Sequence, residues 1–224
     1  MKAGERAARA HAYENPRPEV QALVPRDARR VLDLGCASGA LGGALKARQP
    51  VEVVGVEVDP DYARDAAGRL DRVIEADVEE LAGRDGLAAE LGRFDCLIAA
   101  DVLEHLVDPW RTLRVFAALI EPGRHAVVSL PNVRYWETFW QLGRHGVWPR
   151  RCEGIFDQTH LRWFTLTDAI ALLRGAGLEP DRVSRQIRLL PQGSRFDRHA
   201  RRLERVRFVR PFFTFQYVVA ARKR

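Results

Sequence analysis

The sequence predicts an α/β protein with a Rossmann-like, mostly parallel sheet of seven strands and helices on both faces. Short apolar or β-branched runs alternate with helix-forming segments through residues 29–130, as in repeated strand–helix units. These runs have no polar face, which is typical of strands buried on both sides. Two more strand-like runs follow in the last third, and no crossover helix follows the final one. The last strand can therefore enter the sheet antiparallel, as a hairpin partner.

Each element follows from its local pattern. Five buried strands are expected in the first part of the chain, at 31–34, 51–56, 73–74, 94–99 and 126–130. Leucines and alanines at three- and four-residue spacings predict the helices between them, at 40–48, 62–69, 86–91 and 110–120. An aromatic insertion, Tyr135 to Trp148, comes after the fifth strand. A helix over 166–175 and two strands, at 178–187 and 212–221, complete the pattern.

Length and composition limit the class of protein. A chain of 224 residues that is 46% hydrophobic is long enough for one sizeable core, so we expect a single domain. No run approaches the roughly 18 consecutive apolar residues of a membrane span, and residues 1–12 lack the apolar centre of a signal peptide. We therefore expect a cytoplasmic protein. The three cysteines are too widely spaced for a disulfide framework or a CxxC site.

Positive charge is concentrated near the C-terminus. The formal net charge is +6, and residues 182–210 hold ten arginines against two acidic residues. A solvated arginine-rich face is one interpretation, and a phosphate-bearing substrate or an anionic membrane surface is the functional alternative. The chain has no recognised nucleic-acid-binding motif, which argues against a nucleic-acid partner. Its oligomeric state is not readable from the sequence.

The segment Val-Leu-Asp-Leu-Gly-Cys-Ala-Ser-Gly at 31–39 is a strand that breaks into a tight turn and opens a helix. Gly35 and Gly39 permit the turn and a close ligand approach, while Ala37 stays small and the helix N-terminus offers amide groups. The purely structural alternative is an ordinary turn. Asp33 would repel a pyrophosphate but suits a cationic amino group, and alanines replace two glycines that a dinucleotide-binding turn requires.

Acidic residues stand at the tips of the next strands. Glu57 ends the second strand, where it could accept both ribose hydroxyls, with Val58 beside it. Asp77 follows the third strand, where it could accept an adenine amino group while Val78 packs on the ring. Ala100 ends the fourth strand. Because the carboxyl ends of parallel strands meet at one crevice, we expect a nucleoside there.

The motifs DLGCASG, GVEVDP, EADV and FDCLIAADVLEHL, in this order, resemble those of class I S-adenosylmethionine (SAM)-dependent methyltransferases. The later Ser-Leu-Pro-Asn run, the aromatic insertion and residues 156–165 are similar to a bacterial branch with many glycan- and natural-product-modifying enzymes. The family often has glycine at position 37 and aspartate at position 57, and alanine costs little provided that its backbone angles are ordinary. The resemblance implies SAM as cofactor, contacted by Asp33, Gly35, Ala37, Gly39, Glu57, Asp77, Val78 and Ala100.

An N-terminal element from Tyr13 to Glu19 resembles the segment that closes over the cofactor in this branch. Arg17 could pair with the methionine carboxylate, and an exposed loop arginine is the alternative. Within the single domain we distinguish four parts. They are an N-terminal lid (1–28), a cofactor-binding core (29–130), an acceptor cap (131–165), and C-terminal strands with the basic segment (166–224).

Two histidines are candidates for the general base that a hydroxyl acceptor requires. His105 follows the fourth strand, and His160 lies in the Asp-Gln-Thr-His segment, where Asp157 could orient an imidazole. We rank His160 first, although either histidine could instead tie down a loop. Histidines and acids lack metal-ligand spacing on any one element, so no metal is expected.

The expected function is methyl transfer to a hydroxyl of a small molecule, such as a sugar, a glycan or a natural product. Arginines around the aromatic insertion favour an acceptor with phosphate or carboxylate groups, and packing on the core accounts for some of the aromatic residues. Two alternatives stay open. One is a complex-forming protein like MetW of methionine biosynthesis. The other is a quinone or lipid O-methyltransferase with peripheral membrane contact, indicated by Val-Leu-Glu-His-Leu and by the phenylalanines of 208–215.

Overall fold

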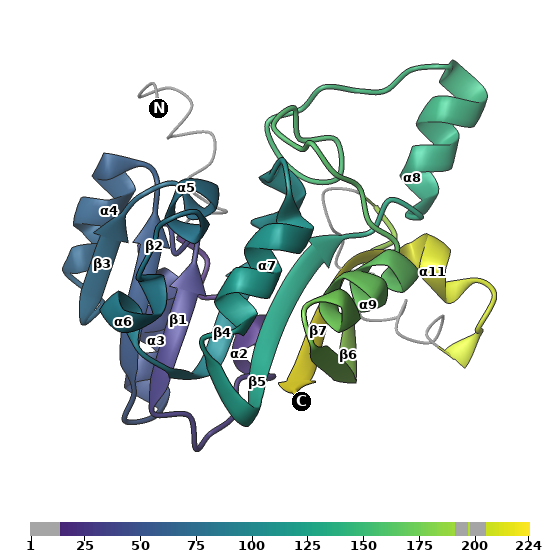
Figure 1. Ribbon diagram of the computed structural model, residues 1–224. Helices are drawn as coiled ribbons and strands as arrows, with labels where there is room; N and C mark the ends of the chain where they lie inside the picture. The colour runs from purple at the N-terminus through teal and green to yellow at the C-terminus, as the bar shows by residue number, and fades with distance from the viewer. Residues whose placement is uncertain (1–13, 191–196, 198–204) are drawn as a thin grey trace.

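The computed structural model describes residues 14–190, 197 and 205–224. Its centre is a seven-stranded sheet in the order β3-β2-β1-β4-β5-β7-β6 (Figure 1). The strands are β1 (Arg30–Leu34), β2 (Glu52–Glu57), β3 (Arg72–Glu75), β4 (Phe94–Ala100), β5 (Ile120–Pro131), β6 (Leu178–Ile187) and β7 (Thr214–Lys223). The first five run parallel, and β7 is antiparallel to both β5 and β6. The predicted fold class is confirmed.

Helices cover the sheet in two layers (Figure 1). One layer packs on Leu32 and Leu34 of β1, and the other packs on Val31 of the same strand, because alternate side chains point to opposite faces. The first layer contains α5 (Val78–Ala82), α6 (Leu87–Leu91), α7 (Pro109–Ala117) and α9 (Leu166–Gly175). The second contains α2 (Pro18–Gln21), α3 (Ala40–Arg48) and α4 (Pro60–Ala67).

Local patterns located most elements well. Helices α3 and α9 and strand β6 have the predicted bounds, and the capping box of Thr165 and Asp168 explains why α9 starts where it does. The short helix α5 was not predicted; Asp77 caps it by accepting from the backbone N–H groups of Glu79 and Glu80. The 3-10 turn η1 (Leu103–His105), which follows β4, was also missed.

Much of the aromatic insertion is helical. It forms α8 (Trp136–Phe139), which continues as the π-helix η2 (Trp140–His145) and projects beyond the carboxyl end of β5 (Figure 1). The helix α11 (Arg210–Phe213) leads into β7. Residues 191–196 and 198–204 of the arginine-rich segment lie outside the described residues, as does Tyr13. The division into lid, core, cap and C-terminal part stays a prediction.

None of the helices in the described ranges is both long and apolar enough to cross a membrane.

Candidate active site

The turn after β1 is built on left-handed backbone. Gly35, Ala37 and Gly39 have φ of +65°, +47° and +78°. A Cβ atom on Gly35 would lie 2.5 Å from Cγ2 of Val102, in the segment after β4. Glycine at this position therefore serves both the turn and the close packing of two strand ends.

Ala37 does not have the ordinary backbone angles on which its low cost depended, so that expectation is wrong. Its φ of +47° is in the left-handed region, which costs an L-residue about 1–2 kcal/mol. The backbone N–H of Ala37 donates to Oε2 of Glu57 at 2.9 Å. The turn thus keeps a costly conformation that points an amide group at the end of β2.

Glu57 ends β2 and is buried. Its Oε2 accepts from Ala37 N, and its Oε1 accepts from Asp59 N at 2.9 Å. Burial raises the pKa of Glu57, while backbone N–H groups of Asp59, Ala37 and Val58 oppose that rise. A carboxylate offers about four acceptor sites, so this group can also accept a ligand hydroxyl.

Asp33 is a buried acid that lacks a partner for one oxygen. Its side chain is 2% exposed, and within the described residues Oδ2 has no hydrogen-bond partner. Burial, followed by the negative charge of Glu57, raises the pKa of Asp33 to about 7, although Arg17 opposes the rise. Because a buried carboxylate is costly without a donor or a cation, a cationic amino group would stabilise it here.

The remaining predicted cofactor residues lie at the same carboxyl edge. Val58, directly after Glu57, is 60% exposed, and its contact with a ligand stays a prediction. Asp77 and Val78 follow β3, where Asp77 caps α5 and Val78 is buried in the core. Ala100 is the last residue of β4 and is half-buried.

Arg17 lies in a network across the strand ends and not on an exposed loop. Its Nη1 donates to Oδ2 of Asp101 at 2.5 Å, and its Nη2 donates to Oγ of Ser129 at 3.0 Å and Oε1 of Gln216 at 3.3 Å. Nε donates to Glu19 at 2.5 Å. Burial lowers the pKa of Arg17, but the charges of Asp101 and Glu19 outweigh burial and raise it overall. A contact between Arg17 and the cofactor stays a prediction.

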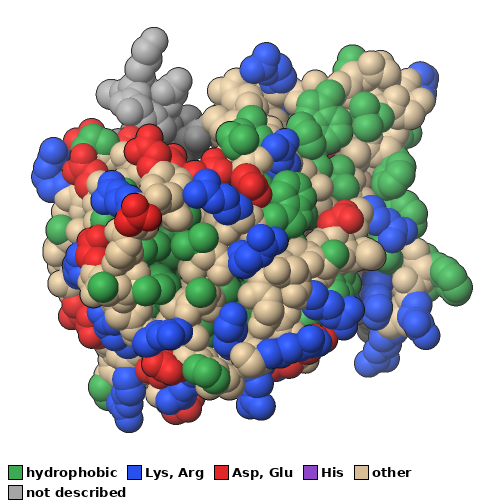
Figure 2. Space-filling view, in the orientation of Figure 1, with side chains coloured by type: hydrophobic (Ala, Val, Ile, Leu, Met, Phe, Trp, Pro, Cys, Tyr) green, Lys and Arg blue, Asp and Glu red, His purple; other side chains and the backbone are tan. Residues whose placement is uncertain are grey.

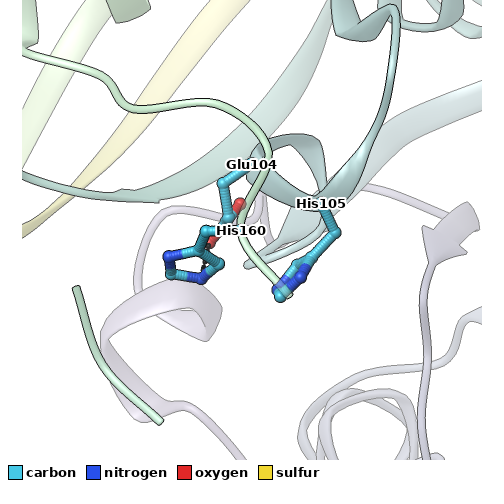
Figure 3. Close-up of side chains that lie close together, drawn as sticks. All are labelled: Glu104, His105 and His160. Carbon is cyan, nitrogen blue, oxygen red and sulfur yellow. Dashed lines mark ion pairs between the residues drawn. The ribbon is translucent and has the colours of Figure 1, made fainter. Parts of the chain in front are cut away.

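The two candidate bases lie against each other (Figure 3). The ring centroids of His105 and His160 are 4.6 Å apart in an edge-to-face arrangement. Nδ1 of His160 is 3.2 Å from the carbonyl oxygen of Ile155, and Nδ1 of His105 is 3.0 Å from Oγ1 of Thr159. Burial, followed by the nearby His105, lowers the pKa of His160.

Asp157 orients the neighbouring histidine through a threonine. Oγ1 of Thr159 donates to Oδ1 of Asp157 at 2.6 Å. Oγ1 of Thr159 also contacts Nδ1 of His105. Asp157 was expected to be able to orient an imidazole. The structure inserts Thr159 between the two side chains.

Glu104 is the site residue that sequence reasoning missed. It is 1% exposed, and its Oε1 lies 3.9 Å from Nε2 of His160. Burial, followed by the charge of Asp101, raises the pKa of Glu104 well above its ordinary range. The available signal in the sequence was that Glu104 and His105 are adjacent at a strand end. Their proximity to His160, which makes Glu104 a site residue, depends on the fold.

A cavity of about 390 Å³ opens beside His160. Trp148 packs edge-to-face on Phe156 and Trp163, with ring centroids 4.9 Å and 5.4 Å apart. These aromatic rings give the cavity broad apolar walls on which a flat ligand can stack. The lining residues are Trp148, Pro149, Arg150, Phe156, Asp157, Gln158, His160 and Trp163.

Most of the aromatic insertion does not reach this cavity. Tyr135 is buried against Phe215, and Nε1 of Trp136 donates to the carbonyl oxygen of Leu189 at 3.0 Å. Apolar side chains gather on the surface around α8 (Figure 2). Those that are exposed there are Phe139, Trp140, Leu142 and Val147. Packing was expected to account for some of the aromatic residues of the insertion and the acceptor site for the rest, and Trp148 is the one that lines the cavity.

Comparison with known proteins places the chain in a family. Residues 8–183 match the model of a family described as a methyltransferase domain, and this match covers well over half of the chain. A ubiquinone biosynthesis O-methyltransferase from Ralstonia nicotianae is 33% identical over 111 residues, which are 49% of this chain and 46% of the relative. One of the same name from Xylella fastidiosa is 36% identical over 110 residues, 49% of this chain and 44% of the relative. The chain therefore spans about half the length of the curated relatives it matches.

Solved structures share the fold at low sequence identity. A SAM-dependent methyltransferase from Archaeoglobus fulgidus has a TM-score of 0.63 at 18% identity, with 96% of this chain and 94% of the other covered. The Burkholderia thailandensis 1,6-didemethyltoxoflavin-N1-methyltransferase, solved with S-adenosylhomocysteine, has a TM-score of 0.60 at 19% identity, with coverages of 98% and 82%. Together with the matched family model, this shared fold shows that the chain belongs to the class I SAM-dependent methyltransferase family.

Proposed function

We propose that this chain transfers the methyl group of SAM to a hydroxyl oxygen on an aromatic ring. The observation that carries this proposal is the cavity walled by Trp148, Phe156 and Trp163, with His160 on its lining. Flat apolar walls favour a ring, and the histidine gives its hydroxyl a proton acceptor. The curated relatives, named for O-methylation in ubiquinone biosynthesis, support an aromatic acceptor.

The residues at the strand ends fit the cofactor. The Oδ2 atom of Asp33 needs a donor, which the amino group of SAM would supply. Glu57 would accept the ribose hydroxyls while it holds the turn through Ala37, and Val58 offers apolar surface to the adenine. When bound, SAM supplies a methyl group made electrophilic by its sulfonium.

The protein then has two tasks, which are to align the acceptor and to take up its proton. The aromatic walls restrict the acceptor to a few orientations, and alignment of this kind is a large part of catalysis. His160 lies where the cavity meets the end of β4, with its Nδ1 beside the carbonyl oxygen of Ile155. That contact makes Nδ1 the protonated nitrogen, so Nε2 is the atom that would take the hydroxyl proton.

A sugar or glycan acceptor is the second candidate. Tryptophan faces stack on sugar rings as well as on aromatic ones, and Arg150 on the cavity lining would suit a phosphate or carboxylate group. The MetW-like alternative stays a prediction, as does membrane contact.

The test is methyl transfer by the full chain with SAM and a panel of acceptors, followed by mass spectrometry. The panel holds ortho-dihydroxylated aromatic rings with and without a prenyl tail, sugar nucleotides and free monosaccharides. Transfer to an aromatic hydroxyl is the expected result. Transfer to sugars alone would replace the aromatic acceptor, and no transfer with intact SAM binding would favour the MetW-like reading.

Two variants link the activity to the site. Glu57→Ala should abolish binding of S-adenosylhomocysteine, the product, measured by calorimetry. His160→Asn should keep that binding but lower the rate about 10²–10⁴-fold, the usual contribution of proton transfer. The matched control is His125→Asn. His125 also lies beside a carboxylate, that of Asp181, but it pairs with Cys96 and so lies away from the carboxyl ends of the strands. A rate unchanged by His160→Asn would contradict its assigned role.

A further inference from the structure

We propose that Glu104, His105 and His160 form a binding site for a divalent transition-metal ion, for which Zn²⁺ is the best chemical fit. One ligand atom from each of these side chains lies within 4.8 Å of the other two. Glu104 and His105 come from η1, at the end of β4, and His160 comes from the loop packed over it (Figure 3). Two imidazoles and a carboxylate are a donor set that proteins use for zinc.

The carboxylate has the features of a metal ligand. Glu104 is 1% exposed, and its Oε2 has no hydrogen-bond partner within the part of the chain that the structure describes. A buried acid is normally paired with a cation or coordinated to a metal, because an unpaired charge is costly in a protein interior. In the described ranges, the ion-pair partner of Glu104 is His160, at 3.9 Å. A cation between these two groups would stabilise both.

The histidines are oriented as metal ligands are. A metal-binding imidazole usually gives its second ring N–H to a carbonyl or carboxylate group, which fixes the ring and its tautomer. Here Nδ1 of His160 lies 3.2 Å from the carbonyl oxygen of Ile155. Nδ1 of His105 lies 3.2 Å from the carbonyl oxygen of Thr159, whose hydroxyl is held in turn by Asp157. In both rings Nε2 is therefore the nitrogen suited to a metal.

Metal binding requires the three ligand atoms to move closer together. Metal bonds of about 2.0–2.1 Å at tetrahedral angles place neighbouring ligand atoms roughly 3.3 Å apart. The separation of 3.9 Å between Glu104 and His160 has to shorten by about half an ångström, and separations up to the 4.8 Å limit have to shorten by up to about 1.5 Å.

The donor set also predicts which ions will not bind. Mg²⁺ prefers oxygen ligands in octahedral geometry, so two imidazoles exclude it. Three protein ligands leave a tetrahedral ion one open position, as in catalytic zinc sites. Resting on the proposed function, this position would take the acceptor's hydroxyl oxygen, because His160 also lines the aromatic cavity. A hydroxyl bound to the metal would lose its proton to water more readily. With the metal bound, Nε2 of His160 would be a ligand and not the base, so His160→Asn would lower the rate through loss of the metal.

The test is a calorimetric titration of the chelator-treated full chain with ZnCl₂ alone, at pH 7.5. Cys152 is replaced by serine throughout, because it is the exposed cysteine and its thiolate could bind zinc. We expect one tight site for Zn²⁺ and no heat with Mg²⁺. Glu104→Gln, His105→Asn and His160→Asn should each weaken binding at least 10-fold. The matched control, His125→Asn, keeps the parent affinity because the Asp181 pair that it breaks has no second histidine.

Absence of a tight Zn²⁺ site, or parent affinity retained in all three ligand variants, would overturn the inference. The side chains of Glu104 and His160 are only 1% and 6% exposed, whereas His105 makes an exposed contact, so His105→Asn should disturb folding least. A second readout for His105→Asn is thermal unfolding. Zn²⁺ should raise the Tm of the parent chain but not that of this variant, while the variant still binds S-adenosylhomocysteine. The zinc titration uses neither cofactor nor acceptor. A chain that methylates but binds no zinc thus refutes this site alone, and a chain that binds zinc but no S-adenosylhomocysteine refutes only the proposed function.

Discussion

Replacing Asp33 by asparagine should stabilise the ligand-free protein and weaken its hold on the cofactor. Burial and Glu57 raise the pKa of Asp33 from its ordinary 3.8 to about 7. A shift of roughly three units at about 1.4 kcal/mol each sets an upper bound of about 4 kcal/mol on the cost of its ionisation. Asparagine has nearly the same shape and no charge, so it removes this cost.

The effect has a defined dependence on pH. Below pH 4, Asp33 is protonated in both folded and unfolded chains and costs nothing. Between pH 4 and about 7 the unfolded chain releases the proton while the folded chain keeps it, so its contribution to stability falls as pH rises. Above pH 7 the cost is complete. Asp33→Asn should therefore stabilise the protein by up to about 4 kcal/mol at pH 8 and by less than half of that at pH 5.

Urea denaturation at pH 5 and pH 8, without ligand, measures both values. The control is Asp85→Asn, which removes an exposed carboxylate from the loop between α5 and α6. Calorimetry at pH 8 should show at least a 10-fold loss of affinity for S-adenosylhomocysteine, because the amino group loses its anion. The reasoning is refuted if Asp33→Asn has the same effect on stability at both pH values, or destabilises the chain at pH 8.

Three further substitutions test the turn and its supports. Ala37→Gly should stabilise the chain by about 1 kcal/mol, since it removes left-handed strain but adds freedom to the unfolded chain; urea denaturation checks this, and a loss of stability would contradict it. Glu57→Gln should lower the free energy of unfolding by about 1–3 kcal/mol, because the NH₂ group of the amide cannot accept from the N–H groups of Ala37 and Asp59 as the carboxylate does. An unchanged urea midpoint would refute this prediction. Gly55→Ala places a Cβ atom 2.5 Å from Sγ of Cys36 and should lower stability by about 1–3 kcal/mol. The double variant with Cys36→Ala should recover part of this loss. Thermal unfolding measures both variants, and no recovery would mean that another clash dominates.

The amino-acid sequence by itself determined most helices and strands and the edge of the sheet at which the predicted cofactor residues lie. Apolar runs and helical spacings are local properties, so β1 to β5 and α3 could be located without knowing their neighbours. The right-handed chirality of strand–helix–strand units then brings the carboxyl ends of the strands to one edge. For this reason Asp33 and Glu57 could be assigned to one crevice before their positions were known.

Tertiary structure alone decided the chemistry beyond that edge. The left-handed conformation of Ala37 accompanies a hydrogen bond from its backbone N–H to Glu57. The partners of Arg17, such as Asp101 and Gln216, lie far from it along the chain. The same holds for Glu104, His105 and His160, because a loop must fold back over η1 before His160 meets the other two. Local periodicity specifies how each segment is built, whereas the meeting of distant side chains depends on how the loops pack, and no local pattern encodes that packing.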